Sequence, residues 1–150
     1  MLSIGTIAPE IDLPDSSGTQ RKLSEFRGKK VVLYFYSKDN TGGCTKQAVG
    51  YGELNAEFEK KNAVVIGISK DTAASHEKFA EKYSLPFILL SDTEKSAIQA
   101  YDVWKEKKNY GKVTIGVVRT TYIIDENGVI ISAREKVKAA DDPAQTLALL

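Results

Sequence analysis

The residue best suited to chemistry is Cys44, the only cysteine of the 150-residue chain. It follows the apolar run 31–36 and the polar turn Ser37-Lys-Asp-Asn-Thr-Gly-Gly43, and it opens a segment predicted to be a helix. A thiol reacts as the thiolate, which the partial positive charge and free N–H groups of a helix N-terminus favour. The sequence therefore predicts a reactive thiol in a turn that a small substrate can reach.

Three neighbours of Cys44 suggest a pocket for two adjacent oxygen atoms. Thr41 lies three residues before Cys44, so a turn can bring its hydroxyl beside the sulfur. Gly42 and Gly43 let backbone N–H groups approach a ligand without a Cβ clash. The thiolate would attack one oxygen while the pocket stabilises negative charge on the other. On the local pattern alone, a structural thiol in an ordinary helix cap is the alternative.

The composition predicts a small intracellular protein with one domain spanning residues 1–150. The net charge of +1 shows no basic excess that would indicate nucleic acid or a membrane surface. No apolar run approaches the roughly 20 residues that span a bilayer, and the N-terminus lacks the pattern of a signal peptide. A single cysteine excludes an internal disulfide. We expect a cytoplasmic protein.

Apolar runs and their spacing predict the elements that position Cys44. Strands are predicted at 31–36, 63–69, 87–90, 119–125 and 129–134, the last two joined by a hairpin at Asn127-Gly128. Helices are predicted at 44–60, 72–83, 93–101 and 142–150. Gly50 and Gly52 weaken the first of these helices, and Asp141 or Asp142 is expected to cap the last. The lysine-rich segment 104–118 is interpreted as a loop.

The order of these elements predicts an α/β fold. Strands that alternate with helices pair in parallel, and the hairpin adds antiparallel strands. This is the layout of a thioredoxin-like fold, a central mixed β-sheet flanked by helices, with an N-terminal extension and an inserted helix.

The sequence also resembles a known family over nearly its whole length. The most specific segments are Tyr34-Phe-Tyr-Ser-Lys-Asp-Asn-Thr-Gly-Gly-Cys-Thr-Lys-Gln-Ala48 and Arg119-Thr-Thr-Tyr-Ile-Ile-Asp125, with further matches at 5–15, 67–69, 78–82, 89–92, 103–107 and 111–112. On these residues it resembles the peroxiredoxins of the AhpC/TSA superfamily, in particular the bacterioferritin comigratory (Q-type) subgroup. The resemblance implies a thiol peroxidase for hydrogen peroxide and organic hydroperoxides, active in antioxidant defence without a cofactor.

The resemblance also implies roles for individual residues. Cys44 would be the peroxidatic cysteine, which becomes a sulfenic acid, and Thr41 would hydrogen-bond the peroxide. The backbone N–H groups of Gly43 and Cys44 would hold its oxygens. Arg119 would lower the thiolate pKa and stabilise the transition state, as suits a permanently charged guanidinium. Without the resemblance, Arg119 could equally be a surface charge at the start of a strand.

Three positions depart from the family pattern. Ser37 and Gly42 stand where proline is usual, which predicts a looser and wetter pocket. Val49 stands where many members carry a resolving cysteine, and the helix that carries it in other members contains Ser75 and no cysteine. The chain is therefore predicted to be a one-cysteine peroxidase that depends on thioredoxin, glutaredoxin or a small thiol. Whether Ser75 replaces a native cysteine is left open.

The sequence is also compatible with functions other than a peroxidase. A thioredoxin-fold binding module or holdase with an incidental thiol is the main alternative, and a glutathione-dependent monothiol exchanger is another. His76, the only histidine, lies on the apolar stripe of its predicted helix, which predicts a packing or surface role and no metal site. The oligomeric state is expected to be a monomer or a weak dimer.

Overall fold

The computed structural model describes the backbone of residues 1–150 and every side chain except that of Asn109. The strands are β1 (Asp12–Pro14), β2 (Gln20–Lys22), β3 (Lys30–Phe35), β4 (Ala63–Ser69), β5 (Ile88–Ser91), β6 (Trp104–Asn109), β7 (Lys112–Val117), β8 (Thr120–Ile124) and β9 (Ile130–Glu135). The helices are α1 (Gly42–Glu53), α2 (Asn55–Lys60), α3 (Ala73–Tyr83), α4 (Ser96–Ala100) and α5 (Asp142–Ala148), with a 3₁₀ turn at Leu23–Phe26.

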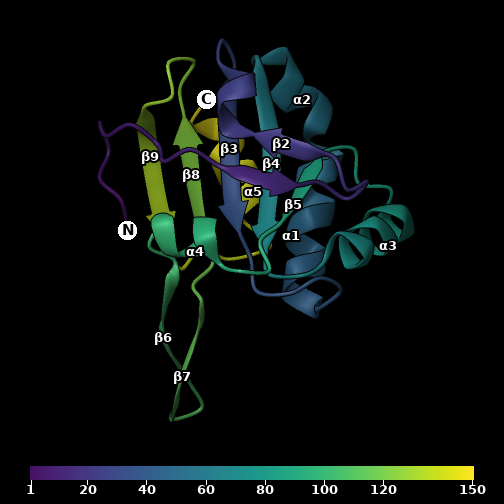
Figure 1. Cartoon of the computed structure of the whole chain (residues 1–150), viewed down its shortest axis with the longest axis vertical. Coiled ribbons are helices and arrows are strands. Elements are labelled where there is room, and N and C mark those ends of the chain that lie inside the picture. The colour runs from purple at the N-terminus through teal and green to yellow at the C-terminus, as the bar shows by residue number, and fades with distance from the viewer.

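The central sheet is mixed, as the sequence predicts, with the strand order β5-β4-β3-β8-β9 (Figure 1). Strand β3 pairs in parallel with β4, and β4 pairs in parallel with β5. On the other side of β3, β8 runs antiparallel, and β9 completes a hairpin at the edge. Strand β3 therefore lies at the centre of the sheet, and the loop that follows it leads to Cys44.

The two faces of the sheet bury separate apolar clusters. Side chains of a strand alternate between faces, and β3 places Leu33 and Phe35 in one cluster and Val32 and Tyr34 in the other. The first cluster is covered by the N-terminal segment and α4. The second is covered by α1, α2 and α3, and it includes Cys44. Burial on both faces explains the unbroken apolar runs of β3 and β4.

The predicted helix 44–60 is two helices. The first ends at Glu53, and Leu54 leaves helical geometry with φ −95° and ψ 3° before α2 begins. The prediction of a single helix was therefore wrong, although the weakening expected from Gly50 and Gly52 lies close to the break. Helix α3 begins where the sequence indicates, with the Thr72 hydroxyl accepting a hydrogen bond from the backbone N–H of Ser75.

The prediction of a loop at 104–118 was wrong. Strands β6 and β7 form an antiparallel hairpin that extends beyond the body of the molecule (Figure 1). Its two-residue turn, Tyr110-Gly111, has φ values of 53° and 78°, the geometry of a type I′ turn. Val113, Ile115 and Val117 alternate along β7 as in a strand, but most of β7 is exposed, and the lysine-rich β6 has no such alternation. Among the described residues, no helix is long and apolar enough to cross a membrane.

Candidate active site

Cys44 lies in the first turn of α1, but its side chain is less accessible than the sequence suggests. Thr41 is the N-cap and Gly42 is the first helical residue. The Cys44 side chain is only 2% exposed, because α1 packs its apolar face on the sheet. Thr41, Gly42 and Gly43 are exposed around it. The thiol is thus buried, while the backbone and hydroxyl groups of the residues just before it are exposed to solvent.

The topology brings Arg119 to Cys44 from 75 residues away. Thr120 at the start of β8 pairs with Phe35 at the end of β3, so the residue before β8 lies beside the loop after β3. The Arg119 Nη2 atom is 3.3 Å from the Cys44 Sγ atom. A Cβ atom at Gly43 would lie 3.3 Å from that Nη2, a crowded distance, so glycine permits the close approach of the guanidinium.

The N-terminus of α1 leaves its first N–H groups for a ligand. No side chain caps it in the part of the chain that the structure describes. The Thr41 hydroxyl instead donates to the carbonyl oxygen of Lys38, at 3.2 Å. The backbone N–H groups of Gly42, Gly43 and Cys44 precede the first intrahelical hydrogen bond, from Thr45 N–H to the Thr41 carbonyl. Donors therefore converge on the space above the thiol, as anion binding requires.

The surroundings of Cys44 favour the thiolate. Burial acts to raise the pKa of Cys44, but hydrogen bonds from the Thr41 hydroxyl and the Lys38 backbone, with the charge and hydrogen bond of Arg119, outweigh burial and lower it. A lowered pKa places more thiolate at neutral pH, and the thiolate is the nucleophile. The four residues predicted for the site, Cys44, Thr41, Gly43 and Arg119, thus lie together.

A buried chain of polar side chains, not predicted from the sequence, holds Arg119 in place. The Gln47 Oε1 atom accepts a hydrogen bond from Arg119 Nη1 at 2.5 Å, and Gln47 Nε2 donates to Asp142 Oδ2 at 3.0 Å. Gln47 and Asp142 are both fully buried. Gln47 follows Cys44 by one helical turn, and this spacing was the available signal. Its amide accepts from the guanidinium while donating to a carboxylate, which fixes its orientation.

The sequence predicts that Asp141 or Asp142 caps the last helix, α5, but Asp142 does not act as its cap. Its Oδ2 accepts from the Tyr51 hydroxyl and the Thr121 hydroxyl, at 2.5 and 2.7 Å, and its Oδ1 accepts from Arg134 at 2.8 Å. Asp141 occupies the N-cap position but makes no side-chain capping bond. The carboxylate of Asp142 turns inward because the donors of α1, β8 and β9 surround it.

A groove of about 640 Å³ borders Arg119. Val113, Val118 and Val137 give it an apolar part, and Lys107, Lys108 and Lys136 give it a cationic part. Lys107 is half-buried, and its Nζ donates to the Val117 carbonyl at 2.8 Å and the Ser37 hydroxyl at 3.4 Å. Burial and repulsion from Arg119 lower the pKa of Lys107. Ser37 therefore contacts a lysine where the family pattern has proline.

Asp39, Asp71 and His76 offer three potential metal-ligand atoms within 4.8 Å of one another. A histidine binds a metal through an unprotonated ring nitrogen. Both ring nitrogens of His76 are occupied in hydrogen bonds, to Asp39 Oδ2 at 2.7 Å and the Leu90 carbonyl at 3.0 Å. We assign no metal to this cluster. Sequence spacing did not show it, because the three side chains come from separate loops and α3.

Comparison with known proteins identifies the family. The AhpC/TSA family profile matches residues 4–133. Peroxiredoxin Bcp of Bacillus subtilis is 44% identical over 149 residues, 99% of this chain and 95% of that protein. A putative peroxiredoxin Bcp of Helicobacter pylori is 47% identical over 138 residues, 92% of this chain and 91% of that protein.

Solved structures agree with the sequence relatives. A cysteine-to-serine mutant of PrxQ from Xylella fastidiosa superimposes with a TM-score of 0.93 at 33% identity, covering 99% of this chain and 95% of that chain. A similar mutant of peroxiredoxin Q from Xanthomonas campestris gives a TM-score of 0.88 at 38% identity, covering 93% and 88%. The predicted thioredoxin-like fold is confirmed. The chain belongs to the AhpC/TSA family, as a peroxiredoxin of the Bcp or Q type and hence a thiol peroxidase.

Proposed function

We propose that Cys44, Thr41, Gly43 and Arg119 form the peroxide site of this thiol peroxidase. The observation that carries the proposal is the 3.3 Å approach of the Arg119 guanidinium to the Cys44 sulfur. A permanently charged group at this distance stabilises both the thiolate and the negative charge that develops on the peroxide. Thr41 and the backbone N–H groups of Gly43 and Cys44 hold the two oxygens of the substrate.

The oxidative step balances with these groups alone. The thiolate attacks one peroxide oxygen, the O–O bond breaks, and an S–O bond forms. The sulfur becomes a sulfenic acid, oxidised by two electrons. The other oxygen leaves as hydroxide or alkoxide beside Arg119 and takes a proton from water. The peroxide is thereby reduced to water or an alcohol.

The reductive half of the cycle needs an external thiol. Cys44 is the only cysteine, so the sulfenic acid cannot form an internal disulfide. One external thiol displaces water to give a mixed disulfide, and a second releases Cys44 as the thiol. The Ser75 hydroxyl is already engaged, donating to Asp39 Oδ2 at 2.8 Å. A thiol is a much weaker hydrogen-bond donor than a hydroxyl. This contact therefore favours serine over cysteine at position 75.

We propose hydrogen peroxide and organic hydroperoxides as the substrates. The groove beside Arg119 has apolar walls that suit an organic substituent. Bacterioferritin comigratory protein of Xanthomonas campestris, 37% identical to this chain, is described as having alkyl peroxide reduction activity. We further propose a single-domain protein, monomeric or weakly dimeric, that works in the cytoplasm with thioredoxin, glutaredoxin or a small thiol.

Without an external thiol, we expect the reduced protein to consume one equivalent of hydrogen peroxide per chain in a rapid first phase, since it holds one thiol, with no repeated turnover afterwards. Mass spectrometry should find one added oxygen, which dimedone traps as a sulfenic acid adduct. Excess peroxide should add a second and third oxygen irreversibly.

Two controls sharpen this experiment. Cys44→Ser should consume no peroxide, and dithiothreitol should restore repeated turnover to the wild-type protein. Sustained peroxide consumption without any thiol would contradict the one-cysteine mechanism. Peroxide consumption by the Cys44→Ser variant would instead contradict the assignment of the nucleophile.

A further inference from the structure

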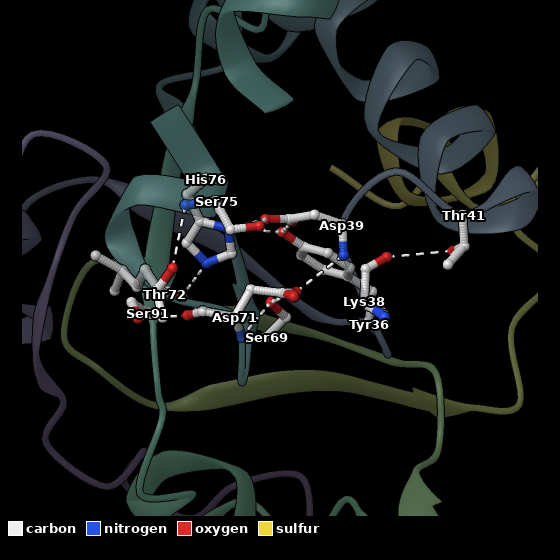
Figure 2. Close-up of polar contacts among 11 residues, drawn as sticks. Tyr36, Lys38, Asp39, Thr41, Ser69, Asp71, Thr72, Ser75, His76 and Ser91 are labelled. Carbon is white, nitrogen blue, oxygen red and sulfur yellow. Dashed lines mark hydrogen bonds and ion pairs between the residues drawn. The ribbon is translucent and has the colours of Figure 1, made fainter. Parts of the chain in front are cut away.

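A buried polar cluster joins the loop before Cys44 to α3 (Figure 2). Its centre is Asp39, 6% exposed, paired with the fully buried His76. Asp39 Oδ1 accepts from the Tyr36 hydroxyl at 2.6 Å, and Oδ2 accepts from Ser75 Oγ at 2.8 Å and His76 Nδ1 at 2.7 Å. Nothing in the reaction above uses these groups directly.

The surroundings of His76 fix where its protons lie. Nε2 faces the Leu90 carbonyl, which can only accept, so Nε2 carries a proton. Nδ1 faces a carboxylate oxygen that already accepts from Ser75, so a second proton lies between Nδ1 and Asp39. Burial acts to raise the pKa of Asp39, but hydrogen bonds from His76, Tyr36 and Ser75 outweigh it and lower the pKa. Asp39 is thus a carboxylate held by His76, Tyr36 and Ser75.

The same loop carries two of the groups that contact the thiol. Lys38 precedes Asp39, and its carbonyl accepts a hydrogen bond from the Thr41 hydroxyl at 3.2 Å. Lys38 and Thr41 are also two of the groups that lower the pKa of Cys44. Between Lys38 and Thr41, Asn40 has a left-handed φ of 59°, a conformation that asparagine adopts more readily than other non-glycine residues and that turns the loop toward α1. The Asp39 backbone N–H is also fixed, donating to Asp71 Oδ2 at 2.9 Å.

We propose that the Asp39–His76 pair is a positioning element of the peroxidase, which fixes the Lys38–Thr41 loop so that its donors reach the Cys44 sulfur. The pair acts through the loop and does not touch substrate. Removing either partner leaves the other buried without its hydrogen bond, which drives the loop to rearrange. The proposal rests on the proposed function of the Cys44 site. It adds a residue of another element, His76 of α3, that influences the reactivity of Cys44.

The test compares His76→Gln and Asp39→Asn with the wild-type protein. Two quantities are measured on folded protein: the rate of Cys44 oxidation by hydrogen peroxide, and the midpoint pH of Cys44 alkylation by iodoacetamide. We expect both variants to oxidise about 10- to 100-fold more slowly, the range that a displacement of about 1 Å at a reacting group can produce. The alkylation midpoint should move to higher pH, because donors to the thiolate are lost.

Two further variants separate positioning from simple loss of stability. Ala80→Gly weakens the same helix at a position outside the Asp39 cluster, and should leave the alkylation midpoint unchanged. The double variant Asp39→Asn/His76→Gln should be no slower than the slower single variant, since both remove one interaction.

The outcomes distinguish this proposal from the function on which it rests. Wild-type oxidation no faster than that of free cysteine would contradict the peroxidase site itself. Fast wild-type oxidation with unchanged rate and midpoint in both single variants would overturn the positioning role alone. If those variants fail to fold, Ser75→Ala decides, because it removes one donor to Asp39 and keeps the Asp39–His76 hydrogen bond. This variant should move the alkylation midpoint to higher pH by a smaller amount. An unchanged midpoint would overturn the proposal.

Discussion

Replacement of Arg119 by alanine is expected to slow the oxidation of Cys44 by hydrogen peroxide by about 10²- to 10³-fold at pH 7, the usual loss for one transition-state donor. The guanidinium lies 3.3 Å from the sulfur and lowers the pKa of the thiol. Its loss raises that pKa, so at neutral pH less of the thiol is ionised. The charge on the departing oxygen also loses its partner. Stopped-flow measurement of the rate between pH 5 and 9 checks both effects.

The pH profile separates the two contributions of Arg119. The rate rises with pH as the thiolate forms, and in Arg119→Ala this rise should occur at higher pH than in the wild type. A rate deficit that persists on the alkaline plateau measures the transition-state part. Arg119→Lys should recover part of the rate, since lysine keeps the charge but not the forked geometry that meets Gln47. Arg21→Ala, in an ion pair elsewhere, is the matched control. An unchanged profile in Arg119→Ala would remove Arg119 from the mechanism.

Replacement of Asp142 by alanine is expected to lower the free energy of unfolding by about 3–5 kcal/mol, the usual loss when one partner of a buried ion pair is removed. The carboxylate is fully buried and accepts from Arg134, Tyr51 and Gln47. Alanine removes the buried acceptor of Gln47 and Tyr51, which lie in the interior, whereas the 24% exposed side chain of Arg134 can turn to water. Urea denaturation followed by circular dichroism gives the loss directly.

Asp141→Ala is the control for this variant, because the exposed Asp141 makes no capping hydrogen bond. We expect it to change stability by no more than about 0.5 kcal/mol. Asp142→Asn keeps the shape and should fall between the two. It should also slow peroxide oxidation, because asparagine keeps one acceptor oxygen where Asp142 has two, which weakens the contact that orients Gln47 toward Arg119. A loss below about 1 kcal/mol in Asp142→Ala would show that the buried network is not a stability determinant.

The sequence predicts best those features that depend on neighbours in the chain. The runs that became β3 and β4 are apolar on both faces, and Thr41 and Cys44 occupy one turn at a helix start. Arg119 is different, because only the family resemblance connected it to Cys44. The physical link is the pairing of β3 with β8, which no local pattern reveals.

The features that were missed depend on contacts distant in the sequence. Gln47 meets Asp142 from 95 residues away, and Asp39 meets His76 from 37 residues away. Each is a buried polar side chain whose partner is decided by how the helices lie on the sheet. The hairpin β6–β7 was missed for a different reason. Val113, Ile115 and Val117 alternate along β7, but the lysines and two glycines of the segment were interpreted as marks of a loop. Its turn depends on left-handed Tyr110 as well as Gly111, and tyrosine is not a residue that predicts such a turn.

The most direct test of the account is the second-order rate constant for oxidation of the Cys44 thiol by hydrogen peroxide at pH 7, measured beside free cysteine. The arrangement of Arg119, Thr41 and the α1 N-terminus predicts a rate constant several orders of magnitude above that of free cysteine, even after correction for the fraction of thiolate. A corrected rate constant within about tenfold of free cysteine would be explained by a lowered thiol pKa alone. That result would contradict a peroxidatic site in this chain, and the interpretation as a binding module would replace it.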